Sequence, residues 1–197
     1  LVLIFGIALS AFGAWLLARH ITGSAIAAGM AMLLYGASPH LLGQAYNGIS
    51  ETVCAGWLPL TLFLLIRLME RPTWLGGLGL GLVAGLCMLT SWYYGLFAGL
   101  GGMIILAWYG ARQPYVVDWR RFAPRAALSL VAAGSLVWPA FRAFQQSLGA
   151  EDALVTRDPE FVESSLINHN ITDVLAFIRP SKTASPDLLA LYGEELL

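Results

Sequence analysis

Six long apolar stretches, separated by short polar turns, dominate the chain. They occupy residues 1–18, 24–41, 52–66, 75–91, 94–111 and 126–144. A helix that crosses the hydrocarbon core of a bilayer needs about 20 mostly apolar residues. Most of the stretches approach that length, and the third reaches it only with its polar flanks. The pattern therefore predicts an all-α, polytopic membrane protein with six transmembrane helices.

Arginine alternates between the predicted turns. Arginine occurs in three of the turns, 19–23, 67–74 and 112–125, as Arg19, Arg67, Arg71, Arg112, Arg120, Arg121 and Arg125. The other two turns, 42–51 and 91–94, contain neither Lys nor Arg. Short loops rich in Lys and Arg stay in the cytoplasm. We therefore expect an integral plasma (inner) membrane protein. Turns 19–23, 67–74 and 112–125 should be cytoplasmic, and turns 42–51 and 91–94 extracytoplasmic.

Composition and charge support this class of protein. With 58% hydrophobic residues, 12% charged residues and a mean hydropathy of +0.70, the chain is too apolar for a soluble domain of its length. A nucleic-acid partner is not expected, because the arginines fall in separate turns and not on one basic face. The lipid bilayer is the expected partner.

The chain divides near residue 145. Nine of its twelve acidic residues lie between Glu151 and Glu195. We expect a transmembrane bundle over 1–145 and an extracytoplasmic acidic segment over 146–197 that contains short amphipathic helices. Because the chain starts at Leu1 inside an apolar run, we also expect it to be a fragment of a longer protein.

Small residues and prolines inside the apolar stretches have structural interpretations. The Gly77–Gly81–Gly85 and Gly95–Gly99 spacings predict close helix packing. Cys54 and Cys87 are expected to be buried free thiols, and a disulfide between them is the alternative. Three prolines lie in the outer third of their helices, at Pro39, Pro59 and Pro139. They indicate either an irregular, hydrated outer half of the bundle or ordinary helix ends.

Polar residues that could bind a substrate or take part in catalysis lie on the predicted outer side. We take as candidate cleft residues His40, Gln44, Asn47, Glu51 and Tyr94. The alternatives are a helix cap for Glu51, a hydrogen-bonded anchor for His40 and an aromatic belt for Tyr94. The candidate phosphate-binding residues are Arg142, Arg157 and Arg179, because guanidinium matches phosphate oxygens in a bidentate way; the alternative is surface charge. The sequence contains no metal-binding pattern.

Four short motifs resemble those of bacterial polytopic glycosyltransferases of the GT-C class. They are Ser38-Pro39, the Trp-Leu-Pro-Leu of Trp57–Leu60, the Ser-x-Tyr-Tyr of Ser91–Tyr94, and Asp173–Pro180. The resemblance extends over most of residues 24–180. It implies transfer of a sugar from a polyprenyl-phosphate carrier to a glycan or lipid acceptor at the outer face of the membrane.

The resemblance also implies a mechanism. A carboxylate in the first outer loop of the full protein, upstream of Leu1, would deprotonate the acceptor hydroxyl, which attacks the anomeric carbon as the lipid phosphate leaves. Cations or a divalent metal would offset the charge on that phosphate. Related proteins often carry a His between Pro39 and Trp57, where this chain has Gln44 and Asn47.

Two other functions compete with this one. A transporter or lipid flippase also uses interrupted helices, but it normally places ionisable groups near the midplane, where this chain has none. A non-catalytic membrane scaffold is the second alternative.

Overall fold

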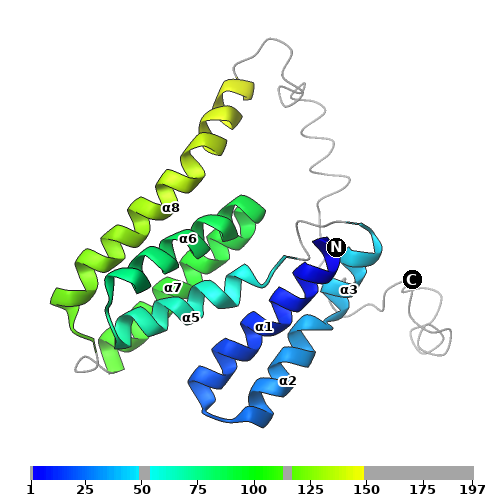
Figure 1. Cartoon of the computed structure of the whole chain (residues 1–197), viewed down its shortest axis with the longest axis horizontal. Coiled ribbons are helices and arrows are strands. Elements are labelled where there is room, and N and C mark those ends of the chain that lie inside the picture. Colours follow the sequence, from blue (N-terminus) through cyan, green and yellow to red (C-terminus); the bar gives the residue numbers. More distant parts are fainter. Residues whose placement is uncertain (1, 49–53, 113–116, 149–197) are drawn as a thin grey trace, which may run out of the picture. The chain divides into compact units, whose positions relative to one another are not determined.

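The computed structural model describes residues 2–48, 54–112 and 117–148, and within these ranges the secondary structure is helical, with no strand (Figure 1). The helices are α1 (Val2–Thr22), α2 (Ala25–Gly36), α3 (Pro39–Tyr46), α5 (Trp57–Glu70), α6 (Trp74–Thr90), α7 (Trp92–Arg112) and α8 (Trp119–Leu148). The all-α prediction is confirmed for the described residues. Residues 1–145 form one compact unit. The predicted acidic segment falls outside the described residues from residue 149 onward, so its amphipathic helices stay a prediction.

The predicted number of transmembrane helices is wrong. Among the described residues, four segments are long and apolar enough to cross a membrane: Val2–Thr22, Ala25–Tyr46, Trp92–Arg112 and Trp119–Ser147. At about 1.5 Å per residue, the 17 residues of α6 and the 14 of α5 extend over about 26 and 21 Å. Both lengths fall short of the roughly 30 Å hydrocarbon core. Each of the six apolar stretches contains a helix, but the helices of two stretches, α5 and α6, are too short.

Several predicted turns are shorter than expected because helices continue into polar residues. Arg19 lies in the last turn of α1, and α8 begins at Trp119, so that Arg120, Arg121 and Arg125 are helical. A long side chain can cover apolar surface while its charged group stays in water, so a helix need not stop where apolar residues stop. Predicted loops 19–23 and 112–125 shrink accordingly.

The predicted outer loops shrink as well. Helix α3 continues to Tyr46, so 42–46 is helical and not loop. Ser91 alone separates α6 from α7, whose first turn contains the rest of the predicted turn 91–94. The loop predictions were therefore wrong in extent at both places.

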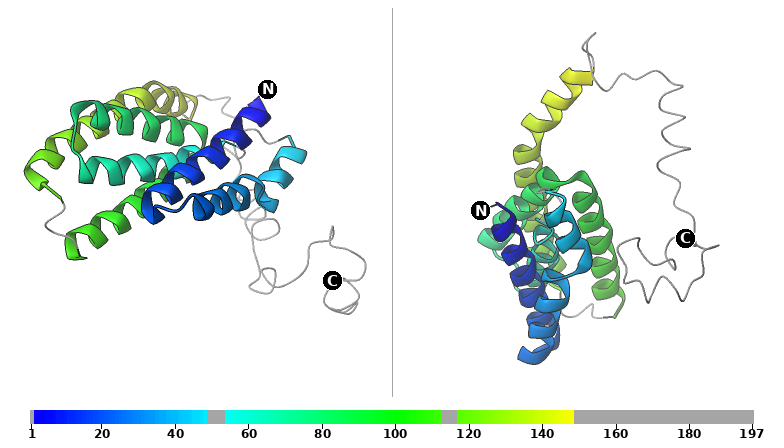
Figure 2. Two further views of the ribbon diagram at one scale, coloured as in Figure 1. Left: turned by 60° about the horizontal axis from the view of Figure 1, so that its bottom comes forward. Right: turned by 90° about the vertical axis from the view of Figure 1, so that its right-hand side faces the viewer.

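Helix α1 lies beside both α2 and α5 (Figure 2). Small residues form the close contacts of α1 with each of them. A Cβ added to Gly36 of α2 would lie 2.6 Å from the Cβ of Ala11, and one added to Gly13 of α1 would lie 2.7 Å from the carbonyl oxygen of Gly56. Contacts this short leave no space for a side chain. Glycine therefore allows α1 to approach both α2 and the start of α5.

The glycine repeat of α6 packs closely against another helix, as predicted, and the structure shows that this helix is α8. A Cβ on Gly77 would lie 2.6 Å from the Arg125 carbonyl oxygen, and one on Gly85 would lie 2.9 Å from Leu136. Between them, the Ser129 hydroxyl donates a 2.7 Å hydrogen bond to the Gly77 carbonyl. The prediction of close packing at Gly95–Gly99 fails at Gly99, because a Cβ added there would have no atom of another part of the described chain within 4 Å.

The prolines behave in two ways. Pro39 occupies the first position of α3 and Pro59 the first turn of α5, where a helix has no need of the missing N–H donor. Pro139, in contrast, lies inside α8. The helix-end interpretation is therefore correct for Pro39 and Pro59 and wrong for Pro139.

Candidate functional site

The short helix α3 presents three of the predicted cleft residues. Its start is set by Ser38, whose hydroxyl accepts a 3.4 Å hydrogen bond from the Leu41 N–H. His40 and Gln44 are four residues apart, and Asn47 caps the C-terminus three residues later, so the three share one helix face. His40 and Asn47 are exposed, and the buried Oε1 of Gln44 has no hydrogen-bond partner among the residues that the structure describes.

The other predicted site residues are distributed elsewhere. Tyr94 lies in the first turn of α7, on a different element from His40. Arg142 is exposed on α8, next to Phe141, whose ring contacts Trp92 at a centroid distance of 6.5 Å; Arg142 therefore lies at the same end of the bundle as Tyr94. Glu51, Arg157 and Arg179 lie outside the described residues.

Sequence reasoning missed a polar cluster around Tyr94. The Tyr35 hydroxyl of α2 donates a 3.1 Å hydrogen bond to the Ala55 carbonyl. Tyr35, Tyr94 and Cys87 lie near one another, and the Cys87 and Thr61 side chains are hydrogen-bonded. Tyr35 could have been noticed as an isolated polar group inside an apolar stretch.

The two cysteines are free thiols, as predicted. Cys87 is fully buried, and Cys54 is half-buried. Burial raises the pKa of the Cys54 thiol. Neither residue forms a disulfide in the structure.

An apolar pocket of about 620 Å³ lies between α1, α2 and α5. Small-molecule sites typically have volumes of about 300–1,000 Å³. Its walls are almost entirely apolar, with the Tyr35 side chain as a polar group. It is lined by Ala14, Leu17, Ala18, Ile21, Thr22, Ala31, Leu34, Tyr35, Leu58, Pro59 and Leu62. The pocket has the size and character to hold a hydrocarbon chain.

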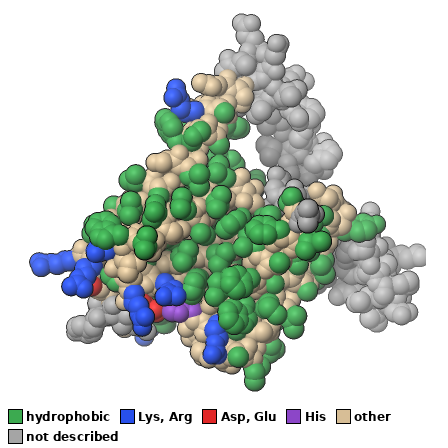
Figure 3. Space-filling view, in the orientation of Figure 1, with side chains coloured by type: hydrophobic (Ala, Val, Ile, Leu, Met, Phe, Trp, Pro, Cys, Tyr) green, Lys and Arg blue, Asp and Glu red, His purple; other side chains and the backbone are tan. Residues whose placement is uncertain are grey.

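The last turns of α1, α5 and α7 carry Arg19, Arg67 and Arg112 and lie at the same end of the bundle as the arginine-bearing start of α8 and the first turn of α6. We call this end the Arg-rich end. A second pocket joins His20, Glu70 and Tyr109 from three of these helices. Arg125 of α8 lies over the Trp74 ring of α6, 4.7 Å from its centroid. Figure 3 shows basic side chains along one edge of the bundle, with a histidine and an acidic side chain among them.

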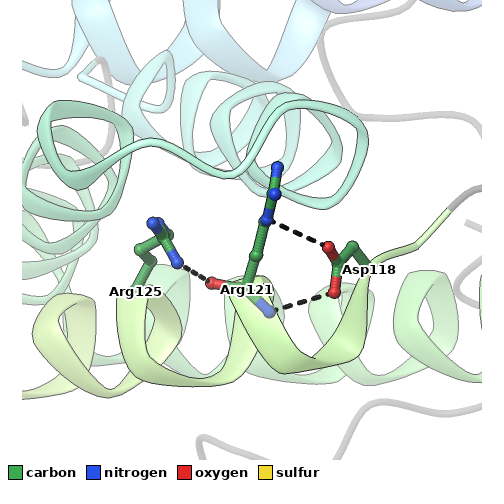
Figure 4. A network of polar contacts seen from close by, with 3 residues as sticks. All are labelled: Asp118, Arg121 and Arg125. Carbon is green, nitrogen blue, oxygen red and sulfur yellow. Dashed lines mark hydrogen bonds and ion pairs between the residues drawn. The ribbon is translucent and has the colours of Figure 1, made fainter.

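Asp118 and two arginines form a polar network at the start of α8 (Figure 4). The Asp118 carboxylate accepts a 3.2 Å hydrogen bond from the Arg121 N–H and lies 3.3 Å from its guanidinium. Arg125 donates a 2.6 Å hydrogen bond to the Arg121 carbonyl. Exposed pairs of this kind contribute about 0–1 kcal/mol. The network caps the start of α8.

Among the residues that the structure describes, no group of three or more His, Cys, Asp and Glu side chains is arranged to hold a metal ion. Comparisons with protein-family models, with curated proteins and with solved structures give no match. The resemblance to the GT-C class therefore stays a prediction.

Proposed function

We propose that this chain is the membrane-embedded part of a glycosyltransferase that takes its sugar from a polyprenyl-phosphate carrier at the outer face of the plasma membrane. Four helices long and apolar enough to span a membrane support the membrane location. The resemblance of four short motifs to those of the GT-C class suggests the chemistry. The pocket between α1, α2 and α5, which we call the carrier pocket, is the observation on which the proposal rests.

The carrier pocket suits an isoprenoid chain because of where it opens. Ile21 and Leu34 line it, yet they are 64% and 73% exposed on the apolar surface of the bundle. A chain already dissolved in the bilayer gains little from hydrophobic burial, so its binding depends on shape and on the headgroup. A pocket open to lipid allows the carrier to enter sideways while its phosphate stays at the membrane boundary.

The polar groups for the headgroup lie away from the Arg-rich end. In the proposal, the isoprenoid chain follows the carrier pocket toward Tyr35. The face of α3 that bears His40, Gln44 and Asn47 meets the sugar phosphate, and Arg142 is the described cation at that end. This arrangement requires the Arg-rich end to face the cytoplasm, in accordance with the positive-inside rule.

Photo-crosslinking tests the carrier pocket. Membranes that contain the chain are irradiated with a benzophenone-bearing polyprenyl phosphate, and the labelled peptides are identified by mass spectrometry. Labelling should map to α1, α2 and α5. Ala31→Trp, which fills the pocket, should lower labelling about tenfold, equivalent to about 1.4 kcal/mol.

Ile26→Trp is the matched control. Ile26 lies on the same helix, is 78% exposed and does not line the carrier pocket, so labelling of this variant should equal that of the parent chain. Equal labelling of both variants would show that the polyprenyl chain does not bind in the carrier pocket.

Sugar transfer is measured separately, with a radiolabelled polyprenyl-phosphate sugar in membranes that contain the full protein. The proposal predicts label in a glycan or lipid acceptor. Carrier binding at the pocket without any labelled acceptor would instead favour a flippase.

A further inference from the structure

A second pocket, at the Arg-rich end, contains ionisable side chains that the proposed function does not use. It has a volume of about 600 Å³ and lies between α1, α5 and α7. His20 Nε2 lies 2.9 Å from Glu70 Oε2, and the Tyr109 hydroxyl is hydrogen-bonded to the same carboxylate. We call this site the His20–Glu70 pocket. Three polar groups that converge in an otherwise apolar pocket are characteristic of a binding site.

The walls of the His20–Glu70 pocket belong to the apolar outer surface of the bundle. Ile21, Ile104 and Trp108 line it and are 64%, 71% and 56% exposed. Because these helices include candidate spans, this surface faces hydrocarbon in a membrane. An occupant must therefore present an apolar chain to the walls and a polar group to the acid.

Glu70 retains capacity to accept hydrogen bonds. The Nε2 atom of His20 is close to its carboxylate, but the ring N–H is not aligned for a hydrogen bond. The Glu70 side chain is 33% exposed, so its carboxylate is open to a further hydrogen-bond donor from an occupant of the pocket. A primary ammonium group, with three N–H donors and a positive charge, would satisfy it.

Two arginines flank the same pocket. The Arg112 guanidinium lies over the ring of Trp108, which lines the pocket, at 5.4 Å from the ring centroid. The Arg67 guanidinium lies over Phe63, at 5.8 Å, and the Phe63 ring packs edge-on against His20. Both arginines can pair with a phosphate at the membrane boundary. An acid inside the pocket and cations at its rim complement a headgroup with an ammonium and a phosphate.

We propose that the His20–Glu70 pocket binds one phospholipid whose headgroup carries a primary ammonium, as phosphatidylethanolamine does. The ammonium contacts Glu70, the phosphate lies at the arginine-bearing rim, and an acyl chain lies against Leu17, Leu62 and Ile104. This site adjoins the carrier pocket, with which it shares Leu17, Ile21 and Leu62, but its headgroup contacts are its own and do not depend on sugar transfer.

Native mass spectrometry of the full chain, released from phosphatidylcholine nanodiscs doped with a second lipid, tests the proposal. Phosphatidylethanolamine should be retained in preference to phosphatidylglycerol. Retention should fall in steps as the amine is methylated, because each methyl group removes an N–H donor. Equal retention along this series, or a preference for phosphatidylglycerol, would overturn the proposal, and neither result depends on a variant.

Protein variants locate the site. Glu70→Gln should lower phosphatidylethanolamine retention about fivefold, the effect of losing about 1 kcal/mol from a charge-assisted hydrogen bond, and should leave phosphatidylglycerol retention unchanged. Asp118→Asn removes an acid from the same end but outside the pocket, and should have no effect. Equal losses in the two variants would contradict the assignment.

A third variant keeps the test decisive should Glu70→Gln fail to fold. Ile104→Trp fills the pocket from its exposed wall and leaves every polar side chain in place. It should lower retention of phosphatidylethanolamine to the level of phosphatidylcholine. Unchanged retention would place the lipid elsewhere on the bundle.

Discussion

The packing of α6 against α8 leads to a sharp prediction about two glycines on the same helix. Gly81 faces α8: a Cβ at this position would overlap the Ser129 carbonyl oxygen and lie 2.7 Å from the Cβ of Ala132. Gly79, two residues earlier, has no atom within 4 Å of the corresponding position. Both Gly81→Ala and Gly79→Ala add one methyl group to α6. At Gly81 the methyl group collides with α8, whereas at Gly79 it enters open space.

The magnitude follows from three contributions to the free energy of unfolding. Each Gly→Ala change raises helix propensity by about 1 kcal/mol. Overpacking at Gly81 costs about 1–3 kcal/mol, because the obstructing atoms are backbone. Separation of the helices also stretches the Ser129–Gly77 hydrogen bond, and such bonds average about 0.6 kcal/mol in a membrane protein. Gly81→Ala should be less stable than Gly79→Ala by about 2–4 kcal/mol.

The assay is reversible unfolding of the chain in bicelles by titration with a denaturing detergent, followed by circular dichroism. Gly79→Ala should unfold at or above the midpoint of the parent chain, and Gly81→Ala clearly below it. Coincident midpoints for the two variants would refute the close approach of α6 and α8, and with it the interpretation of the glycine repeat.

Three further outcomes are expected. Ser129→Ala should lower stability by about 0.6 kcal/mol in the same assay, since it removes the hydrogen bond to α6 without adding volume; an unchanged midpoint would contradict this. Tyr35→Phe should cost about 1 kcal/mol through loss of its hydrogen bond to the Ala55 carbonyl; no change would show that the bond is not formed. In detergent, Cys87 should react with maleimide only after unfolding. Cys54 should react in the folded chain, and because burial raises its pKa, its rate should keep rising at a pH where an exposed thiol has levelled off.

Helical structure at each apolar stretch was predictable because apolar length and glycine spacing are local properties. The repeat Gly77–Gly81–Gly85 identifies a helix face regardless of what packs on it. Ser38-Pro39 likewise indicates a helix start, since the serine caps and the proline fits the first position. These features depend on residues within one or two turns of each other.

Helix ends and the polar pockets were less predictable. The ends extend because Arg19 and Arg121 can stay helical while their charges reach water. The pairing of His20 with Glu70 joins residues 50 positions apart and depends on how α1 packs on α5. A local signal existed, since Glu70 is one of only three acidic residues before Glu151 and lies among arginines. Its partner could not be read from the pattern.

The central claim is that the Arg-rich end and the α3 face lie on opposite sides of a membrane, and labelling of single cysteines tests it most directly. In a chain with Cys54 and Cys87 replaced by Ser, cysteines are introduced at Asn47 and Arg71, two exposed helix caps. In intact cells, a membrane-impermeant maleimide should label Asn47→Cys at once and Arg71→Cys only after permeabilisation. Labelling of both positions from the same side, or of Arg71→Cys alone, would contradict the account.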